Sequence, residues 1–191
     1  MTKNIMIVGV GGQGTLLASR ILGNAIISQG YDVKLSEVHG MSQRGGSVVT
    51  YVKFGEKVYS PIIDQGEADI ILAFEKLEAY RYLPYLKKGG KLIMNAQQIN
   101  PMPVIIGAAK YPEALSEKIA SLADLCEIDA LKIANELGNV RVVNVVLIGV
   151  MASNTDIPYE VWVEALRSTV PPKALEVNLK AFDAGYSRQN S

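Results

Sequence analysis

The sequence predicts an α/β fold, in which a mostly parallel sheet carries helices on both faces and an antiparallel hairpin is added to the sheet. Short apolar segments alternate along the chain with longer segments whose apolar residues recur at the helical period. A glycine-rich segment separates the first apolar segment from the first helical one. Residues 47–61 carry the alternation and the central turn of a hairpin.

In the first half of the chain, the pattern predicts a strand, a helix, a second strand and the hairpin. Residues 4–9 are apolar and β-branched, which is typical of a buried strand. Apolar residues at helical spacing from 14 to 29 predict the first helix. Residues 31–37 alternate apolar and polar side chains and predict the second strand. The hairpin at 47–61 would turn near Gly55.

In the second half, the alternation of strands and helices continues. Residues 68–74 predict a buried strand, 75–90 a helix interrupted by Pro84, and 91–96 the next strand. Further helices are expected at 113–124, 129–137, 159–170 and 173–186, with a short strand at 126–130.

The apolar run at 142–152 fits either a strand or a buried helix, because its period does not distinguish the two. Asn144 lies inside this run. A buried amide needs hydrogen-bond partners, so Asn144 is expected to be a capping residue or a contact to a partner.

The composition fits one domain over residues 1–191. Apolar residues make up 49% of the chain, enough for a sizeable core. Lys plus Arg and Asp plus Glu number 19 each, so no net charge favours nucleic acid or an anionic membrane. The apolar runs, about six residues at the N-terminus and about eleven at 142–152, are too short for a signal sequence or a membrane span.

The chain has one cysteine, Cys126. A single thiol cannot form an internal disulfide, hold an iron–sulfur cluster or complete a structural zinc site. A cytoplasmic protein without a metal site of its own is therefore expected.

Residues 9–14, Gly-Val-Gly-Gly-Gln-Gly, match G-x-G-x-x-G between a predicted strand and a predicted helix. Such a loop in a Rossmann-like sheet lets an anion approach the backbone and aims the N–H groups of a helix N-terminus at it. The anion would be a phosphate or a partner's carboxylate. Alternatively, the glycines serve only tight packing of strand and helix. The candidate cofactor-binding residues are Gly9, Gly11, Gly12, Gln13, Gly14 and Thr15.

A second glycine-bearing loop, residues 39–46 (His-Gly-Met-Ser-Gln-Arg-Gly-Gly), follows the second strand directly. It is therefore expected at the carboxyl edge of the sheet, beside the first loop. Its arginine could bind a phosphate by two parallel, charge-assisted hydrogen bonds. His39 could carry a proton, cap the loop or contact a partner, and no catalytic residue is assigned. The further candidate cofactor-binding residues are Ser42, Gln43, Arg44, Gly45 and Gly46.

The two loops at this spacing, together with residues 59–95 and 136–151, resemble the gamma-type module of the 2-oxoacid:ferredoxin oxidoreductases. Within that superfamily, which includes the pyruvate enzyme, the chain is most similar to the small (beta) subunits of the indolepyruvate branch. The resemblance covers nearly the whole chain and implies one gamma-type domain over residues 1–191.

The resemblance implies a complex that oxidises a 2-oxo acid, indolepyruvate or another aryl pyruvate, to an acyl-CoA and passes the electrons to ferredoxin. Thiamine diphosphate, Mg and [4Fe-4S] clusters would lie in the large (alpha) partner subunit, and coenzyme A is the co-substrate. None of these would be bound by this chain alone, which is expected to be inactive in isolation. The family expectation is a heterotetramer, with a homodimer as the alternative for the isolated chain.

The resemblance also bears on the second loop. In the pyruvate enzyme's module, a glycine loop and a Ser-Lys-Lys-Ser-Gly-Gly segment are expected near coenzyme A. Residues 42–46 match that segment here, with one cation, Arg44, in place of two lysines.

Two other function classes are open. A stand-alone NAD-dependent dehydrogenase or nucleotide-binding module would use the glycine loop and Glu37, which ends the second strand where a dinucleotide fold holds the ribose. Against it, 191 residues leave little room for a substrate domain, and residues 39–46 have no role in it. Glu37 could instead anchor a loop or form an interface ion pair. The second class is a scaffold whose loops bind protein only.

Overall fold

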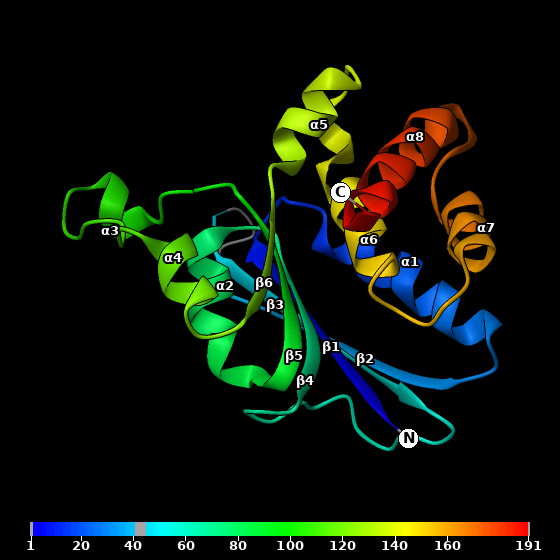
Figure 1. Cartoon of the computed structure of the whole chain (residues 1–191). Coiled ribbons are helices and arrows are strands. Elements are labelled where there is room, and N and C mark those ends of the chain that lie inside the picture. Colours follow the sequence, from blue (N-terminus) through cyan, green and yellow to red (C-terminus); the bar gives the residue numbers. More distant parts are fainter. Residues whose placement is uncertain (1, 41–44, 191) are drawn as a thin grey trace.

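The structure is a computed structural model that describes residues 2–40 and 45–190. Within these residues, six strands form one sheet in the order β2-β3-β1-β4-β5-β6 (Figure 1). Strands β1, β4, β5 and β6 are parallel, whereas β3 is antiparallel to both of its neighbours. The strands are β1 (Lys3–Val10), β2 (Asp32–His39), β3 (Ser47–Gly55), β4 (Ala68–Ala73), β5 (Leu86–Asn95) and β6 (Asp124–Ile128).

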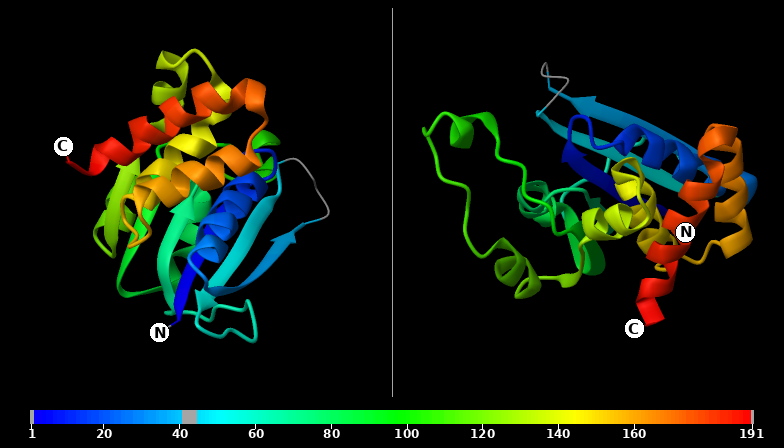
Figure 2. Two further views of the ribbon diagram at one scale, coloured as in Figure 1. Left: turned by 90° about the vertical axis from the view of Figure 1, so that its right-hand side faces the viewer. Right: turned by 90° about the horizontal axis from the view of Figure 1, so that it is seen from above.

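Helices cover both faces of the sheet (Figures 1 and 2). The α-helices are α1 (Thr15–Ser28), α2 (Lys76–Tyr82), α3 (Met102–Ile105), α4 (Leu115–Ala120), α5 (Ala130–Glu136), α6 (Val143–Ala152), α7 (Tyr159–Thr169) and α8 (Leu175–Tyr186). Short 3₁₀ segments are η1 (Leu83–Tyr85), η2 (Val140–Val142), η3 (Pro172–Ala174) and η4 (Ser187–Asn190). Together with the sheet order, this confirms the expected α/β class, including the antiparallel addition.

Two apolar clusters lie on either side of the sheet. Ile5 and Ile7 of β1 pack with α1 and with α5 to α8. Met6 and Val8 of the same strand point to the opposite face, toward α2 and α4. Because successive residues of a strand face opposite sides, a strand covered on both faces must be apolar throughout. This explains why β1 is apolar from Ile5 onward.

Residues 143–152 form a helix, α6, which settles the ambiguity at 142–152. Nearly all of its residues are buried, because α6 lies between the sheet and the outer helices and packs closely against α8. A helix buried on all sides lacks the apolar stripe that distinguishes a helix from a strand. Across residues 2–40 and 45–190, no helix has the length and apolar character needed to cross a bilayer.

The hairpin expected at 47–61 is wrong. Residues 47–55 form the single strand β3, and the hairpin partner is β2, with His39 opposite Val48. The two strands of this hairpin are therefore connected by residues 40–46, and the chain does not form a hairpin about Gly55. β3 also pairs with β1 along its full length, so a second strand after Gly55 would have no open edge to join.

Two further boundaries differ from the expectation. The helix expected at 75–90 ends with α2 and η1, and strand β5 already begins at Leu86. Pro84 lies in η1, where it ends the helical segment instead of interrupting a longer one. The helix expected at 113–124 is shorter, because β6 begins at Asp124.

Candidate functional site

The first glycine loop joins β1 to α1 as expected. β1 ends at Val10, and Gly14 precedes the first residue of α1 with φ 85°. Gly12 has φ 100°, a conformation that side chains rarely adopt, although its surroundings are open. At Gly14 the space is also closed, because a Cβ atom would lie 2.6 Å from Nδ2 of Asn144. Both positions therefore favour glycine because of their positive φ, and Gly14 in addition leaves no room for a Cβ atom.

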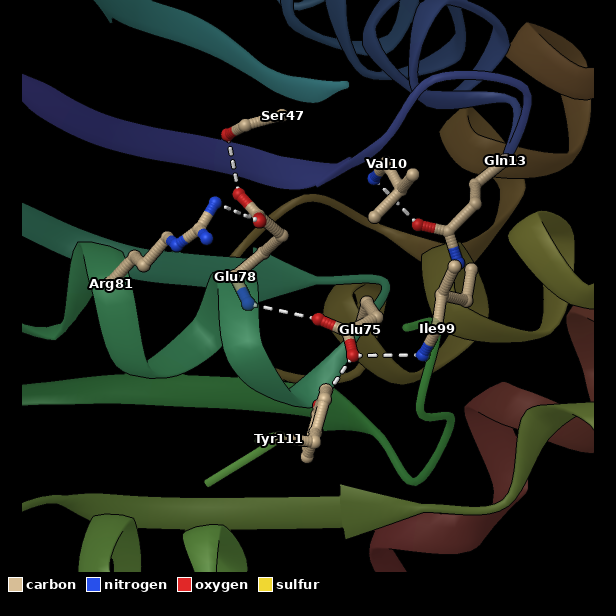
Figure 3. Close-up of polar contacts among 8 residues, drawn as sticks. All are labelled: Val10, Gln13, Ser47, Glu75, Glu78, Arg81, Ile99 and Tyr111. Carbon is tan, nitrogen blue, oxygen red and sulfur yellow. Dashed lines mark hydrogen bonds and ion pairs between the residues drawn. The ribbon is translucent and has the colours of Figure 1, made fainter. Parts of the chain in front are cut away.

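The side chain of Gln13 holds the loop to the sheet. Its Oε1 accepts a hydrogen bond from the backbone N–H of Val10 at 2.7 Å (Figure 3), and its Nε2 donates to the carbonyl of Phe74 at 3.0 Å. Nε2 also lies 3.3 Å from Oε1 of Gln97. Gly9 leaves the room for this arrangement, since a Cβ there would lie 3.0 Å from Gln13 Oε1. The Gln13 side chain and Gly9 therefore support the loop's own structure.

The two glycine loops are bonded to each other through their backbones. Gly11 N–H donates to the carbonyl of Gly46 at 2.9 Å, and Gly45 N–H lies 3.5 Å from the carbonyl of Gly11. Gln13 N–H donates to Val10 at 3.2 Å. The amides of Gly11 and Gln13 are thus already used within the protein. The N–H groups in the first turn of α1 have no acceptors inside that helix and point out of this edge.

These bonds place Gly45 and Gly46 beside the first loop, at the carboxyl edge of the sheet, as the sequence predicts. The other three candidates of the second loop, Ser42, Gln43 and Arg44, lie outside the described residues. His39, the last residue of β2, is exposed, and its Nδ1 lies 3.4 Å from the carbonyl of Gly40.

Asn144 of α6 supports the end of the first loop, next to Gly14. It is the second residue of α6 and is buried. Its Nδ2 donates to the carbonyl of Gly14 at 3.4 Å, and its Oδ1 accepts from the N–H of Val145 at 3.0 Å. The amide expected to cap a helix or contact a partner is therefore hydrogen-bonded within the chain, and it brings the N-terminus of α6 next to that of α1.

Glu37 does not occupy the place of a ribose-binding carboxylate. In a dinucleotide fold, the strand that carries this acid lies directly beside the first strand. Here β3 lies between β2 and β1, so Glu37 is two strand spacings, about 10 Å, from β1. Its Oε2 instead accepts a hydrogen bond from the hydroxyl of Thr50 on β3 at 3.2 Å. The carboxylate thus contacts the neighbouring strand.

Sequence reasoning missed a buried glutamate that holds the start of β3. Glu78 of α2 accepts hydrogen bonds from the hydroxyl of Ser47 and, at 2.8 Å, from Arg81 (Figure 3). Burial raises the pKa of the Glu78 carboxyl above its ordinary value, although the Ser47 hydroxyl and the Arg81 guanidinium act in the opposite direction. Because Ser47 directly follows Gly46, Glu78 fixes the end of the second loop.

A second missed glutamate, Glu75, is buried at the start of α2. Its Oε2 accepts the N–H of Glu78 at 3.0 Å, while its Oε1 accepts the N–H of Ile99 at 3.0 Å and the hydroxyl of Tyr111 at 2.5 Å (Figure 3). Burial, with the bond to Glu75, raises the pKa of Tyr111. The available signal was positional, because Glu75 directly follows the apolar strand and begins a helix with a second glutamate three residues on.

Two cavities in the described part of the chain lie away from the glycine loops. One of about 500 Å³ lies at the amino edge of the sheet, where Lys3, Phe54 and Asp69 line it. Ligands of open α/β sheets bind outside the carboxyl ends of the strands, so this cavity is at the opposite end from the expected site. In the described part of the chain, no three His, Cys, Asp or Glu side chains group as they would to hold a metal ion.

Comparisons with known proteins agree with the family resemblance that the two glycine loops indicate. The family described as pyruvate ferredoxin/flavodoxin oxidoreductase matches residues 4–188. The Pyrococcus horikoshii protein named indolepyruvate oxidoreductase subunit IorB is 48% identical over 190 residues, which cover 95% of this chain and 93% of that one. Ketoisovalerate oxidoreductase subunit VorA of Methanothermobacter marburgensis is 29% identical over 193 residues, which cover 97% of this chain and 37% of that one.

The fold has a solved counterpart. The gamma subunit of a keto/oxoacid ferredoxin oxidoreductase from Geobacter sulfurreducens superposes with a TM-score of 0.73 and 25% identity over 97% of both chains. The family match spans almost every element of the sheet and both of its helical layers. The chain therefore belongs to the pyruvate ferredoxin/flavodoxin oxidoreductase family, which confirms the resemblance inferred from its two glycine loops.

Proposed function

We propose that the chain is the small subunit of a cytoplasmic indolepyruvate:ferredoxin oxidoreductase. The complex converts indolepyruvate, or another aryl pyruvate, to the acyl-CoA and carbon dioxide and passes two electrons to ferredoxin. The near full-length similarity to the archaeal IorB subunit supports this assignment over the other 2-oxo acids of the family. The working assembly is a heterotetramer of two large and two small chains.

The chemistry belongs to the large partner subunit, which would hold thiamine diphosphate, Mg and the [4Fe-4S] clusters. The donor set of this chain supports that division. Cubane clusters need several thiolates, whereas this chain has only Cys126, a half-buried residue of β6. Burial also raises the pKa of that thiol, which disfavours the thiolate form that binds metals.

This chain would bind the phosphates of coenzyme A at the carboxyl edge of its sheet. The ligand groups are the backbone N–H groups of Gly12, Gly14 and the first turn of α1, with the hydroxyl of Thr15 at the start of that helix. The Arg44 guanidinium would add a charge-assisted contact from the second loop. Binding there would orient the coenzyme so that its thiol reaches the acyl group formed in the partner.

One observation carries this proposal: the backbone bonds between Gly11 and residues 45–46 join the two glycine loops into one surface. A glycine loop that bound a nucleotide by itself would not need residues 45–46 bonded beside it. The joined loops offer the N–H groups of a helix N-terminus to an anion, and Arg44 directly precedes Gly45 in the sequence, which together fit the chemistry of a diphosphate or phosphate site.

The test replaces Arg44 in the assembled complex. Arg44→Ala is expected to raise KM for coenzyme A about tenfold or more, because a charge-assisted contact to phosphate is lost, and to leave KM for the 2-oxo acid unchanged. Arg20→Ala, which removes an exposed cation further along α1, is the matched control and should change neither constant. An unchanged KM for coenzyme A in an intact Arg44→Ala complex would show the phosphate role to be wrong.

A further inference from the structure

The segment between β5 and α4 projects from the body of the protein and carries the short helix α3 at its end (Figures 1 and 2). We call residues 98–112 the arm. It has one charged residue, Lys110, whereas 20% of the whole chain is charged. Depletion of charge is the compositional sign of the central part of a protein–protein interface.

The arm exposes three large apolar side chains, two in α3 and one at the residue that directly follows it. Met102, Ile105 and Ile106 are 65%, 66% and 69% exposed. Residues at i, i+3 and i+4 share one side of a helix, so the three side chains form one contiguous apolar surface. This is the arrangement with which a helix enters an apolar groove of another protein.

The base of the arm is fixed to the body of the protein. Glu75 Oε1 accepts hydrogen bonds from Ile99 at one end of the arm and from Tyr111 at the other (Figure 3). Three prolines further restrict the backbone between and beside these ends, at positions 101, 103 and 112. A surface that is ordered before binding loses less conformational entropy when it binds.

The arm and the glycine loops share one edge of the sheet. Gln97, which directly precedes the arm, accepts a hydrogen bond from Gln13 of the first loop at 3.3 Å, and its carbonyl accepts the N–H of Lys76 at 3.1 Å. A protein that brings a reaction centre to the glycine loops must therefore approach the side from which the arm projects.

One relative indicates which kind of protein this unit works beside. In the VorA relative, the region similar to this chain is 37% of the polypeptide, so the remainder is covalently attached to it. The same unit thus works both as a separate chain and as part of a longer one. A unit that is covalently joined to the rest of its enzyme in one relative is expected to contact the corresponding subunit where the chains are separate.

We propose that the arm is the docking element for the large partner subunit, with Met102, Ile105 and Ile106 seated in an apolar groove of that subunit. Glu75 acts as a positioning residue that holds the two ends of the arm. This inference rests on the proposed function, both for the partner and for the edge of the sheet that faces it, but its test measures partner affinity and does not involve coenzyme A. A second copy of this chain is the competing occupant, and the experiment separates the two.

The experiment measures the affinity of the chain for its purified large subunit, and the oligomeric state of the isolated chain by sedimentation. Ile105→Asp/Ile106→Asp is expected to weaken the complex about 30-fold or more, as for central interface residues. The matched control, Tyr59→Asp/Ile62→Asp, changes side chains that are 87% and 53% exposed on the loop after β3, at the other edge of the sheet. The control should bind within about twofold of wild type.

The thermal midpoints of both double variants should equal that of the wild type, because all four side chains are exposed. If the aspartates lower the midpoint, Ile105→Ser/Ile106→Ser provides the same test without added charge. Wild-type affinity in a folded arm variant would overturn the inference. So would an arm variant that only converts a homodimer to a monomer, because that result makes a second copy the occupant. Failure of the wild-type chain to bind the large subunit would instead overturn the proposed partner itself.

Discussion

The glycine loops and the arm lie at the same edge of the sheet, but they are built in opposite ways. The glycine loops are rich in glycine, are joined by backbone hydrogen bonds between Gly11 and Gly46, and offer N–H groups of a helix N-terminus. The arm offers apolar side chains and is held at its ends by one buried carboxylate, Glu75. Backbone groups suit a small anion, whereas a preformed apolar face suits a protein. We therefore propose that one edge of the sheet carries both a ligand surface and a partner surface.

The largest expected effect concerns the glycine loop. Gly14→Ala should lower the free energy of unfolding by about 3 kcal/mol, because it combines positive φ with a Cβ atom pressed against Asn144. Gly12→Ala is the matched control and should cost about 1 kcal/mol, since only its φ is unfavourable. Chemical denaturation of the isolated chain gives both values. Equal losses would show that the contact with Asn144 does not support the loop.

A smaller effect is expected at the base of the arm. Tyr111→Phe removes one donor to Glu75 and leaves the ring in place, so the isolated chain should lose about 1 kcal/mol of stability. Amide hydrogen exchange should accelerate at Ile99, whose N–H shares the same carboxylate oxygen, and should not change at Gly11. Faster exchange at both amides would contradict the view that the two structures are held independently.

The smallest expected effect is a pH dependence of thermal stability that comes from the Glu78 carboxyl. The pKa of this carboxyl is raised in the folded chain, so the folded state favours the protonated form. Its contribution to stability is full below the ordinary value of 4.5 and is lost as the pH rises through the folded value. Glu78→Gln cannot ionise, so its thermal midpoint relative to wild type should rise between about pH 4 and about pH 8.

The control for this titration is Glu176→Gln. Lys180 lowers the pKa of the Glu176 carboxyl, so this glutamate stabilises the protein above its ordinary pKa. Its replacement should therefore lower the midpoint relative to wild type as the pH rises through the lowered value toward about 4.5, and leave that difference nearly constant from there to about pH 8. A flat pH dependence for Glu78→Gln would mean that Ser47 and Arg81 fully offset the burial of the carboxylate.

The fold class and the first glycine loop could be predicted because their signals are local. Apolar strands and G-x-G-x-x-G are contiguous in sequence, and the structure places β1, the loop and α1 accordingly. The hairpin was misplaced because strand pairing is not local. The turn at Gly55 looks like a hairpin turn, but β3 is enclosed by β2 and β1 and leaves no edge there.

The dehydrogenase alternative failed for the same reason. Glu37 has the sequence position of a ribose-binding acid, but the insertion of β3 between β2 and β1 removes it from the glycine loop. The position of Glu75 and Glu78 at the start of a helix was the one available signal, and it is not specific, because acids are ordinary N-terminal residues of helices. Only the tertiary contacts with Ser47, Ile99 and Tyr111 give them their roles.

We propose that this chain supplies the phosphate-binding surface for coenzyme A and that the large partner subunit supplies the chemistry. Calorimetric titration of coenzyme A into the assembled complex and into the purified large subunit alone tests it most directly. We expect binding to the complex and at least about tenfold weaker binding to the large subunit alone, because the charge-assisted phosphate contacts are missing there. Equal affinity of the large subunit and the complex would contradict it.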